Sequence, residues 1–224
     1  MRTFLIFLTV VALTFQSCGT VKVQSTWTAE DPIVAKFKQK NILVIARTSD
    51  NTARTAFETA IAKELNATGS KATESFKKIP TLHTEVEMSE ERMNMILSMI
   101  ESEGFNGIVI TTVKDMEQVT QTNTSGVYMG AGYGGYPGYY GGFNSYYGSR
   151  YAYGPYYSGY GGYMPTSSTT STYNNYVLET VGYSLDEPEE SQLVFVVTSK
   201  LSDPSNDYKT ADEYVEKIVK AFNK

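Results

Sequence analysis

Hydrophobic and polar positions divide the chain into strand-like and helix-like segments. Six segments carry the alternating or continuous apolar pattern of β-strands. They are VKVQSTWT (21–28), NILVIA (41–46), KATESF (71–76), GIVITTV (107–113), YVLETVGYSL (176–185) and QLVFVVTSK (192–200). The continuous runs 41–46 and 107–113 are typical of strands covered on both faces. Residues 21–28 predict a half-buried edge strand, with a flexible tether as the alternative, and the last two segments predict an antiparallel pair.

Apolar residues spaced three to four apart predict two helices between these strands. The first helix follows the capping residue Asp50 and stops near Gly69. The second follows Ser89 and stops at Gly104. Their inward positions are Ala53, Ala56, Phe57, Ala60, Ile61 and Leu65 in the first helix, and Met93, Ile96, Leu97 and Ile100 in the second.

A last helix is predicted near the carboxyl terminus, where Thr210 and Glu213 can form a capping box. Its apolar positions are Ala211, Tyr214, Val215, Ile218, Val219 and Phe222. Strands that alternate with helices imply right-handed crossovers and a parallel centre of the sheet. The sequence therefore predicts an α/β (α+β) fold, in which a mixed β-sheet is packed by three helices and carries a long Gly/Tyr-rich insertion.

This low-complexity insertion spans residues 119–172 and differs in composition from the rest of the chain. Residues 126–163 hold 13 of the 18 tyrosines and 13 of the 18 glycines, and Arg150 is the one charged residue between Glu117 and Glu179. Three interpretations are open: a disordered surface insertion without a core, an adhesive surface of tyrosine rings, or membrane-crossing hairpins. Gly-Gly and Pro interrupt every run that could cross a membrane, which disfavours the third.

Tyrosine side chains of the insertion are the candidate partner contacts. A phenol ring can lie on a sugar face, an aromatic partner or a lipid headgroup while its hydroxyl stays hydrated. The candidates are Tyr133, Tyr136, Tyr139, Tyr140, Tyr146, Tyr147, Tyr156, Tyr157 and Tyr160. The partner expected from this chemistry is an envelope glycan or a protein.

The amino terminus has the layout of a secretory signal peptide, residues 1–17. Arg2 supplies a positive charge, residues 4–15 form an uncharged and largely apolar stretch, and Ser17 offers a small side chain before Cys18. The apolar stretch is too short to remain as a membrane span, which takes about 20 apolar residues. Cleavage before Cys18 leaves 207 residues (224 − 17), which suffice for a single domain, 18–224.

Residues 15–18, FQSC, resemble a bacterial lipoprotein lipobox. Ser17 and Cys18 match the pattern, whereas Phe15 and Gln16 depart from the usual residues. The resemblance implies that Cys18 becomes the first residue and carries a diacylglycerol thioether and an acyl chain such as palmitate on its amine. Two or more acyl chains anchor a protein stably, where one is marginal. The alternative is a free cysteine in a leader that is discarded.

The net charge and the cysteine content exclude some classes of partner and of covalent cross-link. The formal net charge is −5 and becomes −6 when the leader with Arg2 is removed, and the chain has no stripe of Lys and Arg. Nucleic acid is therefore not an expected partner. Cys18 is the sole cysteine, so the chain forms no intramolecular disulfide.

No set of residues in the sequence specifies a reaction. GAGYGG (130–135) fits G-x-G-x-x-G, but Tyr-Pro-Gly follows where a dinucleotide site needs a helix. His83 is the one histidine, and nothing orders Ser75 or Ser89 beside it as a nucleophile. The acidic cluster 85–91 lacks the spacing of a calcium loop. We expect no enzyme activity, no cofactor and no metal.

NILVIA, EGFNGIVITTV and YVLETVGYSL with QLVFVVTSK, in this order, are similar to a family of small uncharacterised bacterial envelope lipoproteins. They are more distantly similar to the TolB amino-terminal domain and the curli-secretion lipoprotein. The resemblance covers most of residues 20–222 and implies a fold and a compartment, but no catalytic residue. The lipobox resemblance, with no aspartate directly after Cys18, implies the periplasmic face of the outer membrane.

The function expected from these features is that of a membrane-anchored periplasmic lipoprotein, a non-enzymatic binding or scaffolding module of the cell envelope. The lipid at Cys18 holds it to the membrane, and the Tyr/Gly insertion contacts envelope glycan or protein. The alternative is a subunit of an oligomeric outer-membrane secretion or pore complex.

Overall fold

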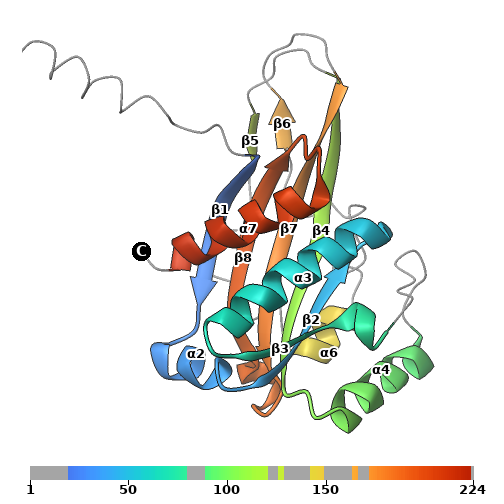
Figure 1. Cartoon of the computed structure of the whole chain (residues 1–224), viewed down its shortest axis with the longest axis vertical. Coiled ribbons are helices and arrows are strands. Elements are labelled where there is room, and N and C mark those ends of the chain that lie inside the picture. Colours follow the sequence, from blue (N-terminus) through green and yellow to red (C-terminus); the bar gives the residue numbers. More distant parts are fainter. Residues whose placement is uncertain are drawn as a thin grey trace, which may run out of the picture.

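A computed structural model describes residues 20–79, 89–120, 126–128, 142–148, 163–165 and 172–222. These residues form an open, mixed six-stranded sheet with helices on both faces (Figure 1). The strands of this sheet, in spatial order, are β1 (Val21–Thr28), β8 (Leu193–Ser202), β7 (Thr172–Ser184), β4 (Gly107–Thr120), β2 (Asn41–Arg47) and β3 (Lys71–Glu74). The helices are α2 (Asp31–Phe37), α3 (Asn51–Ala67), α4 (Glu90–Ser102), α6 (Phe143–Gly148) and α7 (Asp207–Phe222). Two further strands, β5 (Gly126–Tyr128) and β6 (Tyr163–Pro165), pair with each other.

The sheet has a parallel half and an antiparallel half. β3, β2 and β4 are parallel, and α3 and α4 provide the two crossover connections. β4, β7, β8 and β1 are antiparallel neighbours. The α+β fold with a mixed sheet is therefore confirmed, and the predicted edge strand 21–28 is β1, with the same bounds.

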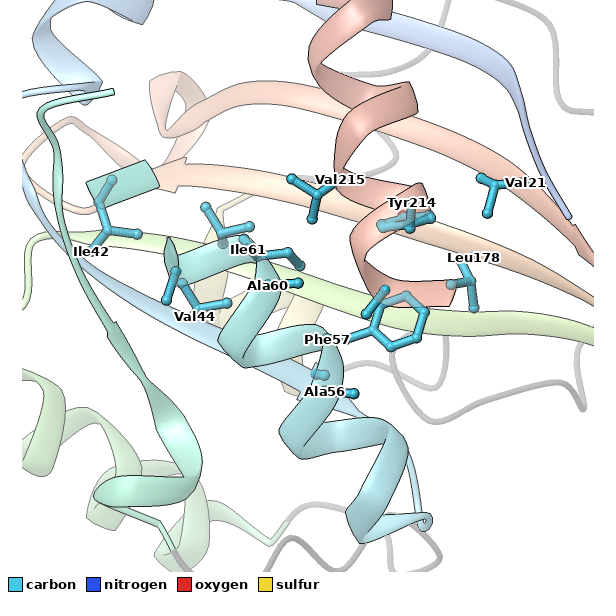
Figure 2. Packing of buried hydrophobic residues seen from close by; sticks show 14 of the residues in the cluster. Val21, Ile42, Val44, Ala56, Phe57, Ala60, Ile61, Leu178, Tyr214 and Val215 are labelled. Atoms are coloured by element: carbon cyan, nitrogen blue, oxygen red, sulfur yellow. The ribbon is translucent and has the colours of Figure 1, made fainter. Parts of the chain in front are cut away.

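Alternating side chains of the central strands divide the core between two faces. The first face, which we call the α3 face, packs against α3 and α7 and includes Ile42 and Val44 of β2 (Figure 2). Phe57 of α3 and Tyr214 of α7 meet there with ring centroids 5.3 Å apart. The opposite face, the α6 face, packs Leu43 and other residues against α4 and α6. Residues 42–46 are almost completely buried, as the continuous apolar run predicts.

Helix termini follow local chemistry. The Asp50 carboxylate accepts hydrogen bonds from the N–H groups of Thr52 and Ala53, and the Ser89 hydroxyl caps α4. Gly69 and Gly104 have φ values of 92° and 71°, a region that favours glycine, so both helices end where predicted.

Besides the three predicted helices, the described chain contains α2 and α6. Two boundaries in the prediction are wrong. The last helix begins at Asp207, because the Asn206 side chain accepts the Lys209 N–H and acts as its cap. Thr210 therefore lies inside the helix and is buried, and it forms no capping box. The segment 71–76 is a strand only to Glu74 and then turns into a 3-10 helix, because the Glu58 carboxylate binds the Phe76 N–H.

The two outer strands of the sheet differ in their exposed edges. The Asn66 side-chain amide donates to the Ala72 carbonyl and accepts the Ala72 N–H, each at 3.0 Å. This contact occupies backbone groups of β3 that another strand could otherwise bind. β1, at the other side of the described sheet, is eight residues long.

One interpretation of the insertion was a surface segment without a core. Helix α6 shows that this is wrong for residues 143–148. Phe143 and Tyr147 of this short helix are completely buried and pack against Tyr183 and other residues of the α6 face. The middle of the Gly/Tyr segment therefore contributes to the core of the domain.

Candidate functional site

One end of the sheet gathers the features that bear on function. At this end β1 and β7 begin and β2, β4 and β8 end, as the strand registers require. We call it the upper end, after its place in Figure 1. The first residue of β1, Val21, pairs with Leu201, which in turn pairs with Tyr176 of β7 and, through it, with Met116 of β4.

β4 and β7 continue beyond this row. Their ladder runs on to the pair of Thr120 with Thr172, four residues past Met116 and Tyr176. At about 3.4 Å per residue, the ladder extends about 14 Å past the start of β1. The insertion between β4 and β7 therefore leaves the body at the same end as the amino terminus.

A pocket of about 290 Å³ opens on the α3 face at the upper end. It lies between the amino-terminal turns of α3 and α7, above the ends of β2 and β8 and the middle of β4. Its lining residues are Ala46, Arg47, Thr48, Asp50, Ala53, Phe57, Thr111, Thr112, Val113, Tyr176, Leu178, Leu201, Pro204, Asp207 and Thr210. Apolar side chains dominate the core side of this lining, and carboxylates and hydroxyls lie at the helix ends.

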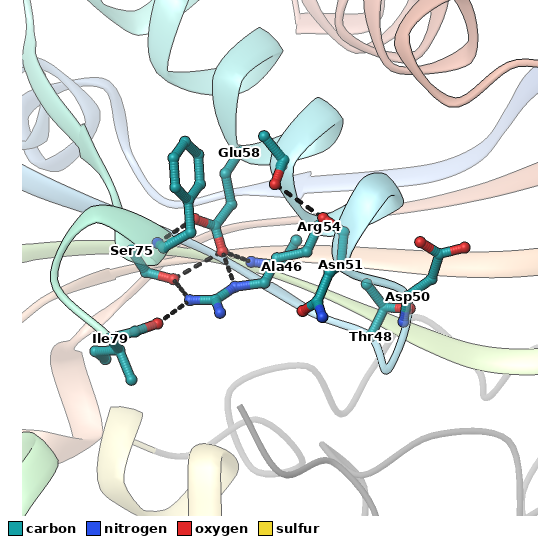
Figure 3. A network of polar contacts seen from close by, with 10 residues as sticks. Ala46, Thr48, Asp50, Asn51, Arg54, Glu58, Ser75 and Ile79 are labelled. Carbon is teal, nitrogen blue, oxygen red and sulfur yellow. Dashed lines mark hydrogen bonds and ion pairs between the residues drawn. The ribbon is translucent and has the colours of Figure 1, made fainter. Parts of the chain in front are cut away.

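A buried polar network holds one wall of the pocket (Figure 3). Glu58 of α3 accepts hydrogen bonds from the Ala46 N–H at 3.0 Å, Arg54 Nε at 3.0 Å and the Ser75 hydroxyl at 2.7 Å. Arg54 also donates to Ser75 Oγ at 2.9 Å and to the Ile79 carbonyl at 2.7 Å. The network ties β2, α3 and the turn after β3 into one unit. In the loop between β2 and α3, the Asp50 N–H donates separately to the Thr48 hydroxyl at 3.2 Å.

The floor of the pocket rests on a chain of hydroxyl groups. The Thr180 hydroxyl lies 2.7 Å from both the Thr111 hydroxyl and the Tyr214 hydroxyl. Burial raises the pKa of the Tyr214 phenol, so Tyr214 stays neutral and able to donate. These groups satisfy one another beneath the pocket and form no reactive set.

Several charged side chains of the strands near the upper end lie on the α6 face. Arg47 donates to the Tyr147 carbonyl at 3.3 Å, and its guanidinium lies 4.8 Å from the centre of the Tyr147 ring. Lys114, in a bulge of β4, forms an ion pair with Glu179 at 3.1 Å. Burial lowers the pKa of Lys114, although the Glu179 carboxylate opposes the shift. Burial likewise raises the pKa of Glu117 against the pull of Lys200.

Most residues that the sequence singled out lie outside the described ranges. This holds for Cys18, for His83, for the segment 130–135, and for Tyr133, Tyr136, Tyr139, Tyr140, Tyr156, Tyr157 and Tyr160. Tyr146 belongs to α6, but its side chain is not among those described. Tyr147 is completely buried, so the prediction that its side chain contacts a partner is wrong.

Candidate chemistry elsewhere has structural partners. Ser75 is buried in the Glu58 network and Ser89 caps α4, so neither is a free nucleophile. Across the described part of the chain, no group of three or more His, Cys, Asp or Glu residues could hold a metal ion. No helix within that part combines the length and apolar character needed to cross a bilayer.

Comparison with known proteins finds similarity in structure alone. No protein-family model matches the sequence, and no curated protein matches it. The fold is weakly similar to that of PelC. The PelC dodecamer from Paraburkholderia phytofirmans superposes with a TM-score of 0.40 at 10% identity, covering 89% of this chain and 94% of that chain. A leucine-to-methionine variant of the same dodecamer gives 0.38 at 11% identity, covering 90% and 96%. No residue role follows from an overlap of this extent.

The pocket was not found by sequence reasoning. Asp50 was recognised as a helix cap, but its place in the same pocket as Asp207 depends on α7 packing beside α3. The available signal was the run of four polar residues Arg47–Asp50 directly after the buried strand predicted for 41–46, since ligands in α/β folds often bind at the carboxyl ends of strands.

Proposed function

We propose that the protein is a lipid-anchored, non-enzymatic binding or scaffolding module of the bacterial cell envelope. Lipid on Cys18 holds the body at the periplasmic face of the outer membrane, and the Tyr/Gly insertion contacts envelope glycan or protein. One geometrical observation carries the proposal: the start of β1 and both ends of the insertion lie at the upper end of the sheet.

That placement limits where the insertion can act. Cys18 precedes Val21, the first residue of β1, by three residues, which span at most about 11 Å when fully extended. A lipid on Cys18 therefore keeps the upper end close to the membrane. The ladder of β4 and β7 extends about 14 Å beyond the start of β1, so the insertion emerges at the membrane side of the body. Tyrosine is a favoured residue at that interface.

The interior of the body supports a role without catalysis. The two buried carboxylates of the sheet and α3, Glu58 and Glu179, each have a basic partner, Arg54 at 3.0 Å and Lys114 at 3.1 Å. Such pairs link neighbouring elements, so these two buried carboxylates have a structural role. The proposal therefore assigns the function to binding surfaces at the upper end.

Mass spectrometry of the native protein tests the anchor. Trypsin is expected to release residues 18–22 (CGTVK) with a diacylglycerol thioether and an acylated amine on Cys18, because cleavage before Cys18 follows modification of its sulfur. In a Cys18→Ala variant we expect the leader from Met1 to stay attached. A native protein with an intact leader, or with an unmodified Cys18 thiol, would contradict the proposal.

A tyrosine-depleted variant tests the contact surface while it keeps the core. The variant changes to serine the residues Tyr133, Tyr136, Tyr139, Tyr140, Tyr156, Tyr157 and Tyr160, and it retains α6. Aromatic contacts contribute about 0.5–1.5 kcal/mol each, so loss of several is expected to reduce binding roughly tenfold or more. The measurements are co-sedimentation with purified peptidoglycan and pull-down from envelope extracts.

The matched control changes the same seven tyrosines to phenylalanine, which keeps the rings and removes the hydroxyls. We expect this control to retain most of the binding. If the serine variant folds and binds as the native protein does, the insertion is not the contact surface.

The alternative role, a subunit of an oligomeric secretion or pore complex, is favoured by one feature. β1 is an eight-residue strand at the edge of the described sheet, and such an edge can pair with another chain. Light scattering of the native protein in detergent separates the two roles. A ring gives discrete large species, and a lone tethered module gives a monomer or dimer.

A further inference from the structure

We propose that the pocket on the α3 face binds a small organic cation, in which an ammonium group is joined to an apolar body about the size of a six-membered ring. The lining residues of this pocket are not part of the segment 119–172, and this inference does not depend on the proposed function.

The volume of the pocket sets an upper limit on the size of the ligand. Its volume of about 290 Å³ lies at the lower limit of small-molecule sites, which commonly measure about 300–1,000 Å³. Phe57, Leu178, Leu201 and Ala53 supply apolar lining. A ligand that fills this space must therefore present carbon to these side chains, because they offer no hydrogen-bonding group.

The net charge of the pocket lining determines which charge the polar group of the ligand should carry. Asp50 and Asp207 both line it, each in the first turn or cap of its helix. Helix amino termini carry about +0.5 charge each, so α3 and α7 together contribute about +1. Against two carboxylates, the balance is about −1. A cation is therefore favoured, although the helix ends weaken the effect.

The Asp50 carboxylate can serve both the helix and a ligand. Its Oδ1 atom accepts both cap hydrogen bonds, from Thr52 N–H at 2.8 Å and Ala53 N–H at 3.1 Å. The Oδ2 atom takes no part in this cap. Tyr176, also in the lining, adds an aromatic ring that can attract an ammonium group.

Basic side chains do not neutralise the pocket from within. Among the described lining residues, Arg47 is the basic one, and its guanidinium lies over Tyr147 on the α6 face. Lys114 of the neighbouring strand binds Glu179, which alternates with Leu178 and so points to the α6 face as well. The sheet thus separates these cations from the two carboxylates of the pocket.

Three probes with the same ring and different charge test the inference by calorimetry on the full-chain protein in detergent, with a detergent blank. They are cyclohexylamine, cyclohexanol and cyclohexanecarboxylate. We expect cyclohexylamine to bind about five- to twentyfold more tightly than cyclohexanol, and cyclohexanecarboxylate to show no saturable binding. An exposed ion pair contributes about 0.2–1 kcal/mol, and two carboxylates together give this range.

Three single substitutions test whether cyclohexylamine binds in the pocket. Ala53→Leu fills part of the space and is expected to abolish cyclohexylamine binding, whereas Ala67→Leu, at the exposed end of the same helix, is expected to leave it unchanged. Asp207→Asn removes one charge with little change in shape, and it is expected to weaken binding about two- to fivefold. Thermal unfolding checks that each variant folds, and the Asp207→Asn result stands even if Ala53→Leu fails to fold.

The inference is overturned by any of three results: no saturable binding of cyclohexylamine, equal or tighter binding of cyclohexanol or cyclohexanecarboxylate, or full affinity in the folded Ala53→Leu variant. A protein that fails the tests of lipid anchoring or tyrosine contact can still pass these, so the two proposals are tested separately.

Discussion

Replacement of Glu58 by alanine is expected to lower the free energy of unfolding by about 3–5 kcal/mol. Glu58 and Arg54 have side chains that are 0% and 2% exposed, and the carboxylate is the ionic partner of the guanidinium. The variant leaves the Arg54 charge buried without that partner and removes the acceptor of the Ala46, Ser75 and Phe76 hydrogen bonds. Urea-induced unfolding, followed by circular dichroism, measures the change.

The matched control is Glu216→Ala on α7. Glu216 and Lys220 also form an i,i+4 ion pair, but both side chains are exposed, and hydrogen bonding to Lys220 lowers the pKa of Glu216. We expect little change in stability, because water screens exposed pairs. Equal effects of Glu58→Ala and Glu216→Ala would show that the buried network contributes no more than a surface pair.

Replacement of Phe143 by alanine is expected to destabilise the protein by about 3–5 kcal/mol, the usual cost of removing a fully buried aromatic ring. Phe143 is 0% exposed and packs 5.2 Å from Tyr147 and 6.0 Å from Tyr183, measured between ring centroids. Its backbone N–H also donates to the side chain of Gln192, which joins α6 to the residue directly before β8. The midpoint of urea unfolding at constant slope measures the loss.

Asn144→Ala is the control for Phe143→Ala, because Asn144 is the neighbouring residue of α6 and is exposed. We expect it to change stability little. A Phe143→Ala variant as stable as the Asn144→Ala variant would mean that α6 does not pack on the body in solution. The same reasoning warns against deleting residues 126–163 as a block, since that deletion removes core residues together with the tyrosine-rich surface.

Sequence patterns were sufficient for the long elements and for the fold class. The runs 41–46 and 107–113 predicted the central strands because a buried parallel strand is apolar on both sides. Asp50, Ser89, Gly69 and Gly104 marked helix ends because their side chains or backbone freedom suit those positions. These signals act over a few residues, which is why they can be recognised without tertiary structure.

The elements that escaped prediction depend on contacts distant in sequence. α2 has seven residues with a proline in its first turn, and it is held by Phe37 against Phe195 of β8, 5.9 Å apart at the ring centroids. α6 is surrounded by glycine and tyrosine, so its two core residues resemble their neighbours in composition. Thr210 and Glu213 fit a capping box, but Asn206 caps α7 one turn earlier.

The candidate sites differ in how much the sequence alone could predict. A lipid on Cys18 and contacts through the insertion stay predictions, because these residues lie outside the described ranges. Tyr147 could not be separated from the other tyrosines by composition, although its helix buries it. The pocket forms where residues 46–50, 111–113 and 204–210 meet, and no local pattern in the sequence brings these three segments together.

The contact of Asn66 with Ala72 has a consequence for self-association. With backbone groups of β3 already occupied, copies that pair through sheet edges have β1 as the available strand. Pairing of β1 with β1 of a second copy is a two-fold contact, which closes after two molecules and leaves no strand for a third. Such a contact alone yields a dimer, so an assembly of more copies needs a second contact surface in addition to β1.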